Sequence, residues 1–196
     1  MAAVDSSFAD CDDTARSTSG YVIWFGSSSV EWGCKRQPLV TMSTCESEYV
    51  AASKCVNGIK ALNKLLTWFR LKSDHPTIVH EDNSACIAVA ANPVHKPRTR
   101  HIAIRYHNVR DACLEKTVFL QQVWTGHQVA DIFTKALHKT EFVRFRGPLR
   151  GYQTFDTMVD ETPKPVKVQS SKYNDVSNAM YNGGCYTTVH ERSWPR

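Results

Sequence analysis

Residues 43–69 read S-T-C-E-S-E-Y-V-A-A-S-K-C-V-N-G-I-K-A-L-N-K-L-L-T-W-F, and this stretch is typical of a long amphipathic helix. Apolar side chains recur at intervals of three and four, the helical period, at Ala52, Cys55, Ile59, Leu62, Leu66 and Phe69. Ser43 or Thr44 is expected to cap the first turn, and Glu46 follows Ser43 at the spacing of a capping box. The stretch therefore predicts one long helix with an apolar face.

The same periodicity singles out one acid in this helix. Extending the apolar stripe one turn backward leads to Glu48, whereas Glu46 points about 200° away from Glu48 at about 100° per residue. We therefore expect Glu48 to face the rest of the domain and Glu46 to face outward. An acid at the head of an apolar stripe needs a partner, although an acid in a first turn can also simply complement the helix dipole.

Strand patterns lie on both sides of this helix. Runs of β-branched and aromatic residues bounded by turn residues predict strands at 2–8, 20–25, 30–35, 77–80 and 117–124. Further helices are predicted at 83–92, 99–115 and 127–137. Strands and helices in this order predict an α/β domain, with a mixed five-stranded sheet flanked by helices.

Composition bounds the organisation of the chain. A length of 196 residues suits one core domain, expected at 1–150. Residues 151–196 show little apolar periodicity and accumulate Gly, Ser, Asn, Pro and Thr, which is typical of a flexible or unrelated extension. The apolar runs are too short to span a membrane, and the N-terminus has no secretory-signal pattern. Seven cysteines without a C-x-x-C pair are typical of free thiols, which favours an intracellular location, cytoplasmic or nuclear.

Charge is unevenly distributed along the chain. The net charge is +5 overall, and residues 83–150 alone carry a net charge of +7. Residues 1–82 are slightly acidic, with a net charge of −2. A basic middle beside an acidic first half is compatible with a polyanionic partner, such as a nucleic acid, although many other proteins share it.

Three further acids stand near predicted element ends: Asp5 in V-D-S-S-F, Asp82 in V-H-E-D-N-S-A and Asp131 in H-Q-V-A-D-I-F-T-K-A-L. If the fold gathers them with Glu48, the carboxylates repel one another unless a cation such as Mg²⁺ holds them. Each acid also has an ordinary interpretation. Asp5 can be a solvated acid, Asp82 a helix N-cap, and Asp131 a surface acid opposite an apolar face.

Five segments of the chain, in order, carry a family resemblance. They are R-S-T-S-G-Y-V (16–22), E-S-E-Y-V-A-A (46–52), E-D-N-S-A (81–85), R-T-R-H-I-A-I-R-Y-H-N-V-R-D (98–111) and A-D-I-F-T-K-A-L (130–137). Together they resemble the ribonuclease H domain that ends the polyprotein of copia-type LTR retrotransposons. The resemblance implies a ribonuclease H-like fold and hydrolysis of the RNA strand of RNA–DNA hybrids. It also implies a reverse transcriptase in the parent polyprotein and Mg²⁺ as the ion, with Mn²⁺ as the alternative.

The resemblance assigns a role to each acid. Asp5 matches the acid on the family's first strand and would bridge two metal ions. Glu48 and Asp82 would hold the ion on the leaving-group side, and Asp131 would help hold the ion that activates the attacking water. Ala103 departs from the family, which commonly has an acid at this position. The alternative function is a catalytically inactive nucleic-acid-binding or interaction module, a retrotransposon relic that keeps the fold.

Basic residues and one histidine complete the predicted site. Phosphate contacts are expected from the basic run, at Lys96, Arg98, Arg100 and Arg105. His127 precedes Asp131 by four residues and would share its face of the predicted last helix. Many ribonucleases H place a histidine near the site, so His127 is a candidate helper in proton transfer. A surface histidine is the alternative interpretation.

Overall fold

The computed structural model describes residues 1–91 and 103–151. The chain divides into two compact units, Met1–Val166 and Lys167–Arg196, and every described residue lies in the first. The predicted domain boundary near residue 150 stays a prediction, because residues 152–196 lie outside the described part of the chain. Within the described residues, no helix is both long and apolar enough to cross a membrane.

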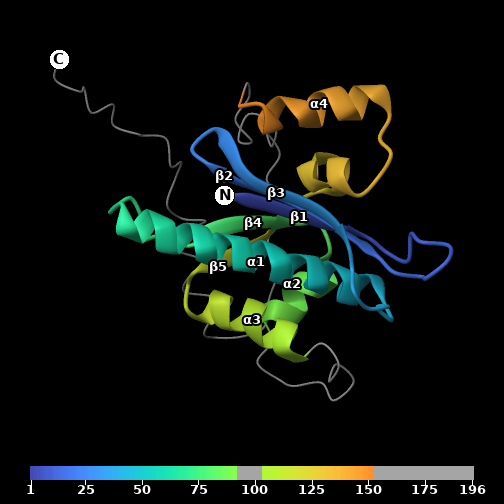
Figure 1. The fold of residues 1–196 in the computed structure, drawn as a ribbon, viewed down its shortest axis with the longest axis horizontal. Helices are drawn as coiled ribbons and strands as arrows, with labels where there is room; N and C mark the ends of the chain where they lie inside the picture. The colour runs from blue at the N-terminus through green and yellow to red at the C-terminus, as the bar shows by residue number, and fades with distance from the viewer. Residues whose placement is uncertain (92–102, 152–196) are drawn as a thin grey trace. The chain divides into compact units, whose positions relative to one another are not determined.

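Five strands form one mixed sheet. They are β1 (Ala2–Ser7), β2 (Thr18–Phe25), β3 (Ser28–Arg36), β4 (Thr77–Glu81) and β5 (Val118–Gln122). Their order across the sheet is β3-β2-β1-β4-β5 (Figure 1). The first three strands pair antiparallel, whereas β1 with β4 and β4 with β5 pair parallel. The predicted fold class and the mixed five-stranded sheet are therefore confirmed.

Helices cover both faces of this sheet. The α-helices are α1 (Thr44–Trp68), α2 (Ser84–Ala91), α3 (Ala103–Leu114) and α4 (Lys139–Leu149), and two 3₁₀ turns are η2 (Thr125–His127) and η3 (Val129–Phe133). Neighbouring side chains of β2 point to opposite faces, as in any strand. Ile23 faces Gly58 of α1, whereas Trp24 packs with Phe145 of α4 and donates a hydrogen bond from Nε1 to the Pro148 carbonyl at 3.1 Å. Figure 1 shows α1 and α4 on either side of the strands.

The segment after β5 departs from the prediction. Residues 127–137 were expected to form one α-helix, but they contain only the last residue of η2, then η3 and a following turn. Gln128 separates the two turns with an extended backbone, φ −75° and ψ 95°. Its side chain is fully buried and donates a hydrogen bond to the Val4 carbonyl of β1. This contact holds the backbone of Gln128 in a conformation that is incompatible with an α-helix. The last α-helix of the described chain is instead α4, which the sequence pattern did not indicate.

Candidate active site

The site begins where two parallel strands separate. β1 and β4 pair only at Ala2 with Val79 and Ala3 with His80. Beyond these pairs the buried amide of Gln128 joins the strands, since Nε2 donates to the Val4 carbonyl at 2.9 Å and to the His80 carbonyl at 3.5 Å. The carboxyl ends of parallel strands that part in this way form a crevice in which ligands commonly bind.

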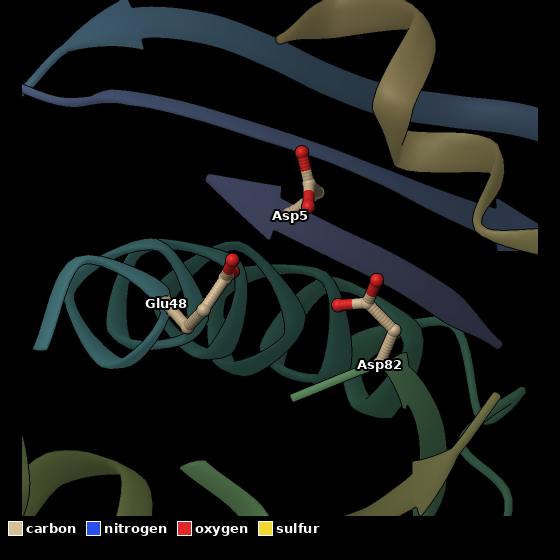
Figure 2. A group of neighbouring side chains, drawn as sticks. All are labelled: Asp5, Glu48 and Asp82. Atoms are coloured by element: carbon tan, nitrogen blue, oxygen red, sulfur yellow. The ribbon is translucent and has the colours of Figure 1, made fainter. Parts of the chain in front are cut away.

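Three carboxylates meet near the carboxyl ends of β1 and β4. Asp5 comes from β1, Glu48 from the first turns of α1, and Asp82 from the residue after β4 (Figure 2). Each offers an oxygen, and these oxygens lie within 4.8 Å of one another. Asp5 is 1% exposed and Glu48 is 6% exposed, so two of the three acids are withdrawn from water. The fold therefore brings together three of the four acids that the sequence singled out.

The start of α1 is fixed against the sheet by hydrogen bonds, which position Glu48. Ser43 is the N-cap, and its hydroxyl accepts from the Glu46 amide at 3.2 Å. The Ser6 hydroxyl of β1 donates to Ser47 Oγ at 2.8 Å, and Gln37 Nε2 donates to the Ser47 carbonyl at 2.9 Å. These bonds involve the residues just before Glu48 and hold the start of α1 close to β1.

Two expectations about neighbouring residues are wrong. Glu46 was expected to face outward, but it is buried, because its carboxylate folds back and accepts from the Met42 amide at 2.5 Å. Asp82 was considered as the N-cap of α2, but Asn83 fills that role, with Oδ1 accepting from the Cys86 amide at 3.0 Å. The Asp82 carboxylate instead belongs to the three-acid cluster, and it accepts a hydrogen bond from the Thr125 hydroxyl.

The environment of these acids favours binding of a cation. Burial raises the pKa of Glu48 well above its usual range, and the carboxylates of Glu81, Asp5 and Asp82 raise it further. Burial and the nearby Asp5 also raise the pKa of Asp82. Glu48 Oε2 is buried and has no hydrogen-bond partner among the described residues. An all-oxygen donor set with an unpartnered buried atom fits a hard divalent cation, which displaces protons from its ligands when it binds.

Glu81 is a fifth acid at the site that the sequence argument missed. It is fully buried, and burial raises its pKa well above the usual range. Its Oε1 accepts from the Asn83 amide at 3.0 Å, which shapes the turn that carries Asp82. A signal was present in the sequence. Glu81 lies two residues after Val79, which is buried, and side chains two residues apart in a strand point to the same face of the sheet.

Asp131 neighbours Asp5 through a shared lysine but does not belong to the three-acid cluster. It is buried rather than a surface acid, and burial together with Asp5 raises its pKa to about 7. Lys135 links the two acids, since Nζ lies 2.9 Å from Asp131 Oδ1 and 3.4 Å from Asp5 Oδ1. The Thr134 hydroxyl donates to Asp5 Oδ2.

Gly20 of β2 makes this approach possible. It lies across from Asp5 in the β1–β2 ladder. A Cβ at this position would lie 2.7 Å from Thr134 Cγ2 and 2.8 Å from Phe133 Cβ. The absence of a side chain therefore lets the Val129–Thr134 segment lie directly against the strands that carry the site.

The structure describes only two of the residues predicted to help in proton transfer or to contact phosphate, namely His127 and Arg105. His127 does not share a helical face with Asp131, because the two residues belong to separate 3₁₀ turns, and its ring packs against Trp124 with a centroid distance of 5.3 Å. Arg105 lies on α3, near Lys54 of α1. The other predicted phosphate ligands, Lys96, Arg98 and Arg100, lie outside the described residues.

Comparisons with known proteins support the resemblance. The chain is 31% identical over 141 residues to the Retrovirus-related Pol polyprotein from transposon RE2 of Arabidopsis thaliana, and 32% identical over 141 residues to that from transposon RE1. Each match covers 72% of this chain and 10% of the relative. The chain thus spans about a tenth of the length of the curated relatives that it matches. No family model matches the chain.

A solved structure supports the fold. LC11-RNase H1, isolated from compost by a metagenomic approach, aligns with a TM-score of 0.51 and 12% identity over 67% of this chain and 89% of that chain. At this identity the likeness concerns the fold alone. The chain is therefore homologous to one segment of the retrovirus-related Pol polyproteins of copia-type transposons, and it has the ribonuclease H fold.

Proposed function

We propose that this domain is a metal-dependent ribonuclease H that hydrolyses the RNA strand of RNA–DNA hybrids. The observation that carries the proposal is the convergence of Asp5, Glu48 and Asp82, whose oxygens lie within 4.8 Å of one another where the parallel strands β1 and β4 cease to pair. Acids so close together, two of them buried, are costly unless a cation neutralises them. The homology to Pol polyproteins supports the same function and suggests a reverse transcriptase as the neighbouring domain of the parent polyprotein.

Asp5, Glu48 and Asp82 would hold one divalent ion. Their carboxylate oxygens are the ligands that Mg²⁺ prefers, and Mn²⁺ is the alternative ion. A bound ion supplies charge stabilisation for the attacking and leaving oxygens of phosphodiester hydrolysis. Asp131, which shares Lys135 with Asp5, would help hold a second ion, the one that activates the attacking water. His127, on the neighbouring 3₁₀ turn, is a candidate helper in proton transfer, with a surface histidine as the alternative.

Cations on α1, α3 and β3 support binding of a polyanion. Lys54 Nζ is buried and has no hydrogen-bond partner among the described residues. Burial lowers the pKa of Lys54, and the nearby Lys35 and Arg105 lower it further. Phosphates would relieve this repulsion, so we propose that Lys35, Lys54 and Arg105 contact the backbone of the hybrid. The predicted contacts from Lys96, Arg98 and Arg100 belong to the same proposal.

Cysteine chemistry bears on the proposed intracellular location. The six cysteines among the described residues, at 11, 34, 45, 55, 86 and 113, are all free thiols. Free thiols of this kind persist in reducing compartments. The cytoplasm and the nucleus are therefore the proposed locations.

The test of the function is cleavage of a hybrid with a labelled RNA strand by the purified full chain with Mg²⁺. Replacing Asp82 by Asn should lower the cleavage rate about a hundredfold or more, because even outer-shell partners of metal ligands typically contribute about 10–100-fold. Glu48→Gln should have a similar effect. Glu46→Gln is the matched control, since Glu46 is a buried acid on the same helix outside the cluster.

Two outcomes would contradict the enzymatic function. The first is a wild-type protein that is folded and cleaves no hybrid. The second is an Asp82→Asn variant that cleaves as fast as the wild type. Salt-sensitive binding of duplexes that responds neither to Mg²⁺ nor to Asp5→Asn would instead favour the inactive nucleic-acid-binding module.

A further inference from the structure

Asp5 belongs to two groups of acids, which differ in their contacts with basic side chains. In the first group, Asp5, Glu48 and Asp82 form the three-acid cluster, and the described residues place no basic side chain in ion-pair contact with Glu48 or Asp82. In the second group, Asp5 and Asp131 share the ammonium group of Lys135. Lys135 therefore contacts Asp5 and Asp131 directly, whereas its charge reaches Asp82 only through space and makes no ion pair with Glu48.

Lys135 contacts the carboxylates of both Asp5 and Asp131, and its side chain still has access to solvent. Its Nζ lies 2.9 Å from Asp131 Oδ1 and 3.4 Å from Asp5 Oδ1, between two carboxylates that are 9% and 2% exposed. The lysine side chain itself is 39% exposed. A lysine ammonium is a compact charge on a flexible four-carbon stem. The group can therefore leave the carboxylates for solvent without any change in the backbone.

A divalent ion that used both Asp5 and Asp131 would have to occupy the region where the ammonium lies. Two cations in contact with the same carboxylate oxygens repel each other strongly in a partly buried site. Binding of an ion there and retention of Lys135 are therefore mutually exclusive.

We propose that Lys135 acts as a built-in cation for the Asp5–Asp131 half of the site, where it competes with a second divalent ion. The free protein then binds one divalent ion, at Asp5, Glu48 and Asp82. A second ion enters only when Lys135 swings into solvent. Lys135 is thus a positioning residue that sets the number of bound ions, and this inference rests on the proposed metal-dependent function.

The test counts ions bound by the full chain without nucleic acid, by calorimetric titration with Mg²⁺ and by titration of free Mn²⁺ with electron paramagnetic resonance. The wild type should bind one Mn²⁺ tightly. Lys135→Ala should bind two, with affinity for the second ion raised about tenfold or more, because one positive charge is removed from contact with the ligands. Lys135→Met serves as a second variant of similar length, and Lys135→Arg should behave as the wild type.

Two controls make the outcomes distinct. Lys139→Ala removes the same charge from an exposed lysine at the start of α4 and should leave one site. Asp82→Asn should weaken the first ion in every background. Equal ion counts in the wild type, Lys135→Ala and Lys135→Met would overturn the role of Lys135 alone. A folded wild type that binds no divalent ion would overturn the proposed function, and the role of Lys135 with it.

Discussion

At the scale of single residues, burial controls the chemistry of the site. Glu48 and Glu81 are removed from water and crowded by other acids, and both effects raise their pKa values. Asp131 is also buried, but Lys135 partly opposes the effect of burial, and its pKa is raised only to about 7. Acids that hold protons so tightly in the free protein should make its stability depend on pH and on divalent ions.

The stability of the metal-free protein is predicted to fall from about pH 6.5 to about pH 8. An acid with a raised pKa binds its proton more tightly in the folded state, so stability is lost as pH rises from the unfolded pKa, about 4, through the folded pKa. Glu48, Glu81 and Asp131 all act in this direction. His80 acts oppositely only below about pH 6.5, because burial lowers its pKa to about 4.

Thermal unfolding across this pH range, with and without Mg²⁺, measures the effect. The stabilisation by Mg²⁺ should grow with pH, since fewer protons have to be displaced from the ligands. Glu48→Gln should flatten the pH dependence of the metal-free protein, because an amide does not titrate. A metal-free wild type that becomes more stable from about pH 6.5 to about pH 8 would contradict the prediction.

Residue-scale features of α1 show what the sequence could specify. The apolar stripe correctly assigned Glu48 to the inner face, because helical geometry extends a pattern with little error over one turn. The same argument failed for Glu46, whose flexible side chain folds back to the Met42 amide. Side-chain conformations of this kind depend on which backbone donors remain unpaired, and periodicity carries no information about them.

At the scale of elements, the Val129–Thr134 segment determines whether Asp131 reaches the site. Its apolar residues have a spacing that a helix would also have, which is why a helix was predicted. The outcome depended on tertiary contacts that no local pattern contains, namely the buried amide of Gln128 on two strands and the close approach over Gly20. The strands and α1, whose patterns follow from local burial, were predicted within a few residues of their ends.

Gly20→Ala is predicted to displace this segment from β2. The new methyl group would overlap Thr134 and Phe133 at distances that real side chains do not adopt. Overpacking of this kind typically costs about 1–3 kcal/mol, so the melting temperature should fall by several degrees. Amide chemical shifts measured by NMR should change in residues 129–135 and change little in α2. Unchanged shifts in the segment would show that Gly20 is not required there.

At the scale of the whole molecule, charge is expected to govern how the domain meets nucleic acid. Lys54→Gln in an Asp82→Asn background, in which cleavage should be slow, should weaken hybrid binding for all sequences alike. The slope of log K against log salt concentration should decrease by about 0.9 if one phosphate contact is lost. Fluorescence anisotropy at several salt concentrations measures both quantities. Lys64→Gln, on the same helix, is the charge-matched control, and an equal effect of both variants would exclude a specific contact by Lys54.

The short pairing of β1 with β4 has a mechanical consequence. Strands β3, β2 and β1 form one part of the sheet and β4 and β5 the other, and between them the ladder contains only the pairs Ala2–Val79 and Ala3–His80. Asp5 belongs to the first part, and Asp82 follows the last residue of β4 in the second. An ion bound by both residues would cross-link the two parts at the point where the ladder is weakest. Ion binding would then stiffen the sheet as well as complete the site, with amide exchange in residues 4–6 and 81–83 slowing together.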